Sequence, residues 1–171
     1  RKAYSDPIRL ITPGRVSADK NIELLISVWN EELVDRYPKA EWYLVGPGPL
    51  LDIVRQRVRA PDRVRMLGRV SHQRMLREMV EADLMLYASL GDTFGLVITE
   101  AKLCRLPIIA LADNAGVSAQ IQDGEIGGYL ATDLAGFVRR LHNALANPLQ
   151  SLNIAECGAD DVNKRFGCTE H

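Results

Sequence analysis

Two carboxylates flank one segment that has the composition of a helix. The stretch "GDTFGLVITEA" covers residues 91–101, with Asp92 before its apolar residues and Glu100 near its end. At 1.5 Å per residue, a helix separates these two positions by about 12 Å. The acid–base carboxylates of glycosidases lie closer together, about 5 to 9.5 Å apart. The spacing therefore favours two carboxylates that grip the two ends of one extended ligand. Alternatively, Asp92 caps the helix and Glu100 lies on its flank near Lys102.

The start of this segment is expected to approach the same ligand with its backbone. A helix that begins at residues 93–96, directly after a strand, directs its free N–H groups toward the ligand edge of a sheet. The apolar residues of its first turns favour a helix wedged against that sheet; these are Phe94, Leu96, Val97 and Ile98.

A pair of cations follows the first apolar run of the chain. The stretch "GRVSADK" places Arg15 after a predicted strand and Lys20 at the start of the next predicted helix. Cations near a helix N-terminus are disfavoured by its dipole, unless an anion such as a phosphate occupies the site. The pair therefore indicates an anion site. The alternative is two surface cations, with Asp19 as the helix cap.

Other polar or glycine-rich positions give weaker signals. The stretch "VGPGP" at 45–49 lets the backbone approach a ligand closely, but a tight turn explains it equally well. It lacks the third glycine of a dinucleotide fingerprint, and its prolines lack N–H groups. His72, which follows Ser71 at a helix start, is expected to be a capping or surface residue, and His142 is expected to be structural.

Short apolar runs alternate with amphipathic ones along most of the chain. The pattern predicts strands at 8–12, 41–46, 63–67, 83–89, 107–112 and 127–132. Helices are predicted at 21–37, 50–58, 72–80, 134–146 and 152–166, besides the segment described above. This alternation predicts an α/β fold: a Rossmann-like open parallel sheet of about six strands with helices on both faces. Ligands of such sheets bind at the carboxyl ends of the strands.

Composition excludes several classes of protein. The chain has 171 residues, 47% hydrophobic and 25% charged, which suits one packed core. With a net charge of −1, the chain has no overall positive charge that would attract nucleic acid or an anionic membrane. Three cysteines without metal-binding spacing indicate reduced thiols and a cytoplasmic location. The opening "RKAYSDP", without Met, indicates a piece of a longer protein.

Taken together, these stretches resemble the C-terminal, donor-binding domain of GT-B glycosyltransferases, specifically the retaining glycosyltransferase family 4. The resemblance runs from about residue 8 to 147 and depends on the order and spacing of several motifs. They are "PGRVSADKNIELLISVW", "WYLVGPGPL", "VRMLGRVSHQRMLREMVEADLMLYAS", "DTFGLVITEA" and "QDGEIGGYLA". It implies transfer of a sugar, of hexosyl type, from a nucleotide-diphosphate sugar to an acceptor hydroxyl in glycan, lipid or polysaccharide biosynthesis. It implies no metal and no other cofactor.

The resemblance also implies roles for individual residues. Arg15 and Lys20 match the pair that binds the donor diphosphate and stabilises the leaving group, and Glu100 matches the carboxylate that holds the ribose. Asp92 stands where a Glu contacts the transferred sugar. The remaining donor-binding positions are the glycines Gly14 and Gly46, the nucleobase loop Gly68, Arg69 and Val70, and the helix start Phe94, Gly95, Leu96 and Val97.

Four positions depart from the family's usual pattern. Asp92 is one methylene shorter than the usual Glu, and Ala88 stands where Pro is usual. Arg105 occupies a position that is usually Gly, and Ala119 one where Glu is common, so no role is carried onto Ala119. These changes leave open an altered donor, weakened catalysis or drift within the family.

The chain has room for only one of the two domains of a GT-B enzyme. Residues 1–150 are expected to form the donor domain, and residues 151–171 a helix and tail that pack toward a missing N-terminal, acceptor-binding domain. The resemblance allows peripheral association with the inner face of a membrane through that missing half. The isolated chain is expected to bind nucleotide but transfer nothing. The alternatives are a non-catalytic scaffold, a GT-B nucleotide-sugar epimerase, and a phospho-receiver module, which would need acidic residues where Thr12-Pro13-Gly14-Arg15 stand.

Overall fold

The chain forms a single six-stranded parallel sheet. A computed structural model describes residues 3–91, 94–113 and 115–167. The strand order is β3-β2-β1-β4-β5-β6, and every neighbouring pair is parallel. The strands are β1 (Arg9–Pro13), β2 (Glu41–Val45), β3 (Val64–Met66), β4 (Leu84–Tyr87), β5 (Ile108–Leu111) and β6 (Gly128–Ala131). The predicted open parallel sheet is confirmed.

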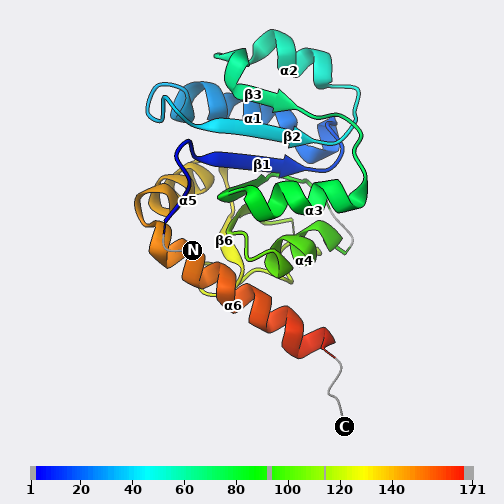
Figure 1. The fold of residues 1–171 in the computed structure, drawn as a ribbon, viewed down its shortest axis with the longest axis vertical. Coiled ribbons are helices and arrows are strands. Elements are labelled where there is room, and N and C mark those ends of the chain that lie inside the picture. Colours follow the sequence, from blue (N-terminus) through cyan, green and yellow to red (C-terminus); the bar gives the residue numbers. More distant parts are fainter. Residues whose placement is uncertain (1–2, 92–93, 114, 168–171) are drawn as a thin grey trace.

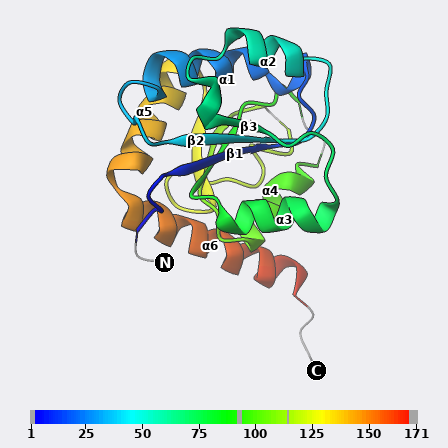
Figure 2. The same ribbon diagram turned by 45° about the horizontal axis from the view of Figure 1, so that its top comes forward.

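Helices cover both faces of this sheet (Figures 1 and 2). One face carries α1 (Ile22–Val28), α2 (Leu51–Arg57) and α5 (Leu134–Ala146). The other carries α3 (His72–Glu81) and α4 (Leu96–Leu103), which lie side by side. The last helix, α6 (Pro148–Phe166), contacts α5, β6 and α4. No helix within the described ranges is both long enough and apolar enough to cross a membrane.

Alternate strand residues supply two separate cores. In β1, Leu10 belongs to the cluster under α1 and α5, whereas Ile11 belongs to the cluster under α3 and α4. This alternation follows from the two-residue repeat of a strand. The ring centroids of Trp29 and Trp42 lie 5.9 Å apart in the first cluster. Trp42 Nε1 also donates to Thr12 Oγ1 at 3.0 Å, which satisfies a buried polar group.

Two predicted helices begin or divide at residues with left-handed backbone. The helix predicted over 21–37 is a 3-10 turn η1 (Ala18–Lys20), then α1, then a π-helical turn η2 (Trp29–Leu33). Asn21 separates η1 from α1 at φ 53°, a conformation that asparagine tolerates. Helix α4 begins at Leu96, later than predicted, because Gly95 before it has φ 56°. Asp19 does not cap α1; Asn21 occupies the N-cap position.

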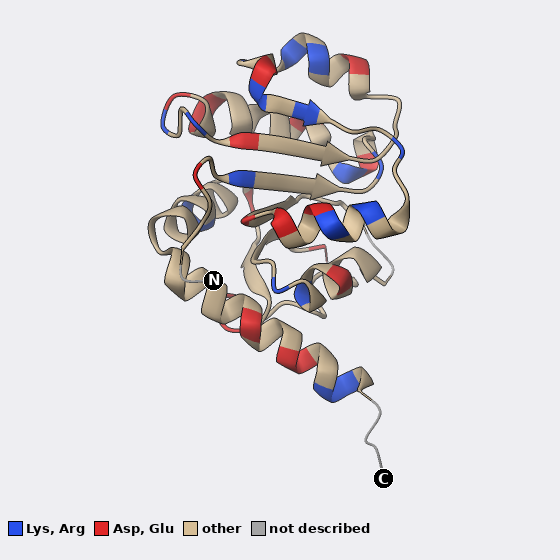
Figure 3. Ribbon diagram, in the orientation of Figure 1, with Lys and Arg blue, Asp and Glu red and all other residues tan. Residues whose placement is uncertain are grey.

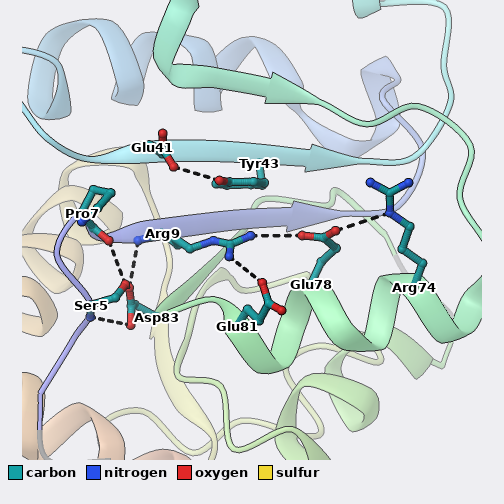
Figure 4. A network of polar contacts seen from close by, with 9 residues as sticks. All are labelled: Ser5, Pro7, Arg9, Glu41, Tyr43, Arg74, Glu78, Glu81 and Asp83. Carbon is teal, nitrogen blue, oxygen red and sulfur yellow. Dashed lines mark hydrogen bonds and ion pairs between the residues drawn. The ribbon is translucent and has the colours of Figure 1, made fainter.

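A polar network fixes the amino edge of the sheet, opposite the predicted ligand edge (Figure 4). The buried carboxylate of Asp83 accepts from the backbone N–H groups of Ser5 and Arg9, both at 2.9 Å, and from the Ser5 hydroxyl. The Arg9 guanidinium pairs with Glu78 at 3.1 Å and Glu81 at 2.6 Å, both in α3. These contacts tie the N-terminal segment and α3 to the start of β1.

Helix α6 is anchored to α4 by a buried ion pair. Lys102 is 1% exposed and donates to Asp161 Oδ2 at 2.7 Å and to the Gln120 carbonyl at 2.9 Å. Beside it, a Cβ on Gly158 would lie 2.6 Å from Gly127 Cα, so the two backbones touch. The predicted domain boundary after residue 150 falls inside α6, which packs on the same sheet as the rest. Along α6, acidic residues come first and basic residues follow in its last turn (Figure 3).

The Lys102–Asp161 pair predicts the acid sensitivity of the fold. Burial raises the pKa of the Asp161 carboxyl, but the hydrogen bonds from Lys102 and Arg165 outweigh burial, and the net pKa lies below its usual value. We expect Asp161→Asn to lower the free energy of unfolding by about 3 kcal/mol at pH 7, because it leaves a buried cation unpaired. A carboxyl with a lowered pKa stabilises the fold above about pH 4, and this contribution is lost as the pH falls further.

Urea denaturation of Asp161→Asn and of the exposed control Asp160→Asn, at pH 7 and pH 3, measures this effect. The difference between the wild-type chain and Asp161→Asn should shrink at pH 3. Equal stability of the two variants at pH 7 would show that the ion pair contributes nothing.

Candidate functional site

The loops after β1 and β4 meet at the carboxyl edge of the sheet. These strands are neighbours, although α1 and α4, which follow them, cover opposite faces. The backbone N–H of Leu90, after β4, donates to the Asp19 carbonyl, after β1, at 2.9 Å. Such a point, where neighbouring strands lead to opposite faces, is where open α/β sheets bind their ligands.

Lys20 is held at this junction by residues from β4. Its Nζ lies 3.4 Å from the hydroxyl oxygens of both Tyr87 and Ser89, and 5.8 Å from the centroid of the Tyr87 ring. The half-buried ammonium group is therefore positioned above the carboxyl end of β4. Sequence reasoning missed Tyr87, whose place at the end of a buried strand was the available signal.

A cleft of about 440 Å³ opens beside Lys20. It is lined by the loop after β1, by β4 and by the start of α4: Pro13, Gly14, Arg15, Lys20, Tyr87, Phe94, Gly95, Leu96 and Val97. The structure thus brings together seven of the predicted site residues. Among the residues that the structure describes, this lining contains two cations and no carboxylate.

The two cations favour negative charge beside the cleft. Arg15 is exposed and makes no ion pair or hydrogen bond through its guanidinium with any described residue. The pKa of the neighbouring Asp19 carboxyl lies below its ordinary value, because a hydrogen bond from Ser17 and then the charges of Lys20 and Arg15 favour its ionised form. An anion in the cleft would meet the same two charges.

Gly46 has a structural role that was not predicted for it. A Cβ on Gly46 would lie 2.0 Å from the Gly14 carbonyl oxygen, and one on Gly48 would lie 2.1 Å from the Val16 carbonyl oxygen. The two loops are joined by backbone hydrogen bonds, from Gly14 to Val45 and from Val16 to Pro47, both at 2.9 Å. These glycines let the β2 loop support the β1 loop, and Gly46 does not line the cleft.

The start of α4 is fixed from the loop after β5. Gln120 donates through Nε2 to the carbonyls of Phe94, at 2.7 Å, and Gly95, at 3.1 Å, and accepts from the Thr99 hydroxyl at 2.7 Å. Phe94 and Leu96 are 77% and 73% exposed, so the expectation that they wedge the helix against the sheet is wrong. The buried face of α4 begins at Ile98, and the exposed pair lines the cleft instead.

Glu100 lies one turn further along α4, on the side facing α3. Its Oε1 lies 2.6 Å from Nε2 of His72, the first residue of α3. Lys102, the neighbour named in the alternative reading of Glu100, pairs instead with Asp161. His72 is a surface residue, as predicted, but Ser71 caps the helix by accepting from the N–H of Arg74 at 3.2 Å. Its pairing with Glu100 was missed.

The predicted nucleobase loop stands outside the cleft but next to this pair. Gly68 has φ 63° and open space around its Cα, Arg69 is exposed, and Val70 packs against the core of its face. These residues lead directly into His72. Asp92, the predicted sugar-side carboxylate, lies outside the described residues.

One departure from the family pattern has a structural explanation. Arg105, where Gly is usual, keeps a left-handed backbone at φ 53°, which costs about 1 kcal/mol for a side chain other than Gly. Its Nε donates to Glu156 of α6 at 2.8 Å. Ala119 is exposed, and the adjacent Gln120 makes the contacts to the α4 start. Nothing in the structure explains Ala88, which is buried.

The close contact between the loops after β1 and β2 predicts that one added methyl group destabilises the fold. We expect Gly46→Ala to lower the free energy of unfolding by about 1 to 3 kcal/mol, because its Cβ would overlap the Gly14 carbonyl. Gly91→Ala is the matched control, since a Cβ there would meet nothing within 4 Å. Urea denaturation compares the two, and a Gly46→Ala variant as stable as the control would contradict this close contact.

Solved structures of similar fold include two proteins bound to UDP. The chain superimposes on *Staphylococcus aureus* TarM with a TM-score of 0.84 and 18% identity, covering 97% of this chain and 34% of TarM. For *Anabaena* HepE the TM-score is 0.78 with 22% identity, covering 93% of this chain and 44% of HepE. These likenesses confirm the fold, one half of a GT-B arrangement.

Sequence comparison identifies the family. The gpi3 subunit of phosphatidylinositol N-acetylglucosaminyltransferase from *Schizosaccharomyces pombe* is 30% identical over 154 residues, which are 88% of this chain and 31% of that protein. The chain therefore spans about a third of the length of this relative. The family model described as "Glycosyl transferases group 1" matches residues 7–147. That match covers most of the chain, which belongs to the glycosyl transferases group 1 family.

Proposed function

We propose that this chain is the donor-binding domain of a retaining glycosyltransferase. The enzyme would transfer a sugar from a nucleotide-diphosphate sugar to an acceptor hydroxyl. The observation that carries this proposal is the cleft in which Arg15, Lys20 and the start of α4 converge at the junction of β1 and β4. Family membership and the UDP complexes of proteins with the same fold support it.

Each group in the cleft has a defined part in this reaction. As the bond to the sugar breaks, negative charge develops on the departing nucleoside diphosphate. Arg15 and the positioned Lys20 would stabilise that charge, and the N–H groups at the start of α4 would add a partial positive charge. We propose that these groups do so without a metal ion. Glu100 would hold the ribose hydroxyls, and Asp92 would contact the transferred sugar.

The relatives narrow the choice of donor and acceptor. The *S. pombe* relative is named for N-acetylglucosaminyl transfer to phosphatidylinositol, and another relative, from *Acholeplasma laidlawii*, for monoglucosyldiacylglycerol synthesis. We therefore propose an acceptor hydroxyl on a lipid or glycan. The UDP complexes of proteins with the same fold support a UDP-sugar donor. The acceptor site would lie on an N-terminal domain of the full-length enzyme.

Nucleotide binding tests the donor cleft. We expect UDP to bind more tightly than GDP or ADP in calorimetric titrations. Lys20→Ala and Arg15→Ala should each weaken UDP binding by about tenfold or more, the effect of losing one hydrogen bond to a charged group. Lys39→Ala is the matched control, because Lys39 is an exposed lysine that pairs with Asp6 before β2.

Two results would overturn the proposal. If none of the three nucleotides binds, the chain is a scaffold that has lost its donor site. If UDP binds equally to the wild-type chain and to both cleft variants, the diphosphate lies elsewhere.

Transfer requires the second domain in this account. We expect the isolated 171-residue chain to show no turnover with radiolabelled UDP-sugars and lipid or glycan acceptors, even where it binds UDP. Product formation by the chain alone would show that the acceptor site lies within these residues.

A further inference from the structure

The contact between His72 and Glu100 joins two helices at the ligand edge of the sheet. The two side chains come from the first turn of α3 and the second turn of α4, 28 positions apart, and their atoms Nε2 and Oε1 lie 2.6 Å apart. The His72 side chain is 64% exposed and that of Glu100 is 26% exposed. The pair therefore lies at the surface, with the carboxylate the more enclosed partner.

Neither helix capping nor pairing with a neighbour on the same helix explains this contact. Helix α3 does not need His72 as a cap, because Ser71 already caps it. Glu100 could have paired with the nearby Lys102, but that ammonium group is buried on the other side of α4 against Asp161. Among the residues that the structure describes, His72 is the hydrogen-bond partner of the Glu100 carboxylate.

The chemistry of the two groups fixes the direction of the hydrogen bond. A carboxylate can only accept, so His72 Nε2 carries the hydrogen and donates to Oε1. Holding one oxygen restricts rotation of the carboxylate and directs its second oxygen, Oε2. No described residue donates to Oε2. One oxygen is thus fixed, while the other is left to accept from a ligand hydroxyl.

We propose that His72 is a positioning residue for ribose recognition. It would hold Glu100 so that Oε2 accepts a hydrogen bond from the 2′-hydroxyl of the donor ribose. The inference rests on the proposed function, in which Glu100 is the ribose carboxylate. It goes beyond that function because it assigns the selectivity for ribose to His72 and Glu100 together. In this pair, His72 acts by positioning Glu100. Preorganisation of this kind strengthens binding by reducing the ordering cost on association.

The preference for UDP over 2′-deoxy-UDP measures this role directly. Calorimetry gives the dissociation constants of the two nucleotides. Their ratio reports the hydrogen bond to the 2′-hydroxyl, because the diphosphate and the base contribute equally to the affinity of both. We expect Glu100→Ala to bring the ratio close to one. His72→Ala should lower the ratio by about three- to tenfold, the range for one weakened hydrogen bond to a charged group, and leave 2′-deoxy-UDP binding nearly unchanged.

Two further variants separate positioning from a merely structural contact. His72→Gln keeps an N–H donor at a similar reach and should retain the ratio, whereas the shorter His72→Asn should behave like His72→Ala. His142→Ala is the matched control: His142 Nε2 lies 2.9 Å from Glu32, a second histidine–glutamate pair that joins α5 to η2. It should leave the ratio unchanged, and thermal unfolding of each variant checks its fold.

The outcomes distinguish this inference from the proposed function. If Glu100→Ala lowers the ratio and the His72 variants do not, Glu100 binds the ribose as proposed, and the positioning role of His72 is wrong. If His72→Ala and His72→Asn weaken both nucleotides equally, the contact only joins two helices, which also overturns the inference. If Glu100→Ala leaves the ratio unchanged, Glu100 does not bind the 2′-hydroxyl, and both its assignment to the ribose hydroxyls and the inference fail.

Discussion

The parallel pairing of β1 with both β2 and β4 is the constraint on which the site depends. It brings three carboxyl ends to one edge, although residues 13–20, 46–50 and 88–91 are distant in sequence. Because the helices after β1 and β4 cover opposite faces, their loops diverge and leave a cleft between them. The network around Asp83 fixes the opposite edge, so β1 is anchored at both ends.

The cleft is built from supported loops rather than from isolated side chains. The β2 loop supports the β1 loop through the close approach at Gly46 and Gly48, which positions Gly14 and Arg15. On the other side, Gln120 holds the carbonyls at the start of α4. The same loop accepts from Lys102, which pairs with Asp161 of α6. The last helix is therefore connected to the cleft through Lys102 and Gln120.

Hydrophobic periodicity predicted most of the fold and much of the cleft. The amphipathic pattern at 134–146 coincides with α5, and every predicted strand is present within a few residues. Arg15 and Lys20 were found because cations near a helix N-terminus are disfavoured unless an anion occupies the site. The start of α4 was predicted too early, since the left-handed conformation of Gly95 depends on its neighbours. Exposure of Phe94 and Leu96 could not be predicted either, because an apolar residue at a ligand cleft resembles one in the core.

Side-chain pairing across distant elements was the least predictable feature. His72 and Glu100 each had an adequate local explanation, as a surface residue at a helix start and as a neighbour of Lys102. Their contact depends on how α3 and α4 pack, which no local pattern specifies. Likewise, the backbone of another loop requires glycine at position 46, a contact that no local pattern specifies.

A crystal structure of the chain with UDP tests the central claim most directly. The account predicts the diphosphate in the cleft between Gly14–Arg15 and the start of α4, within hydrogen-bond distance of Lys20 Nζ. The ribose would lie beside Glu100. UDP bound in another cavity, such as the one lined by Ala146, Pro148 and Ile154, would contradict it.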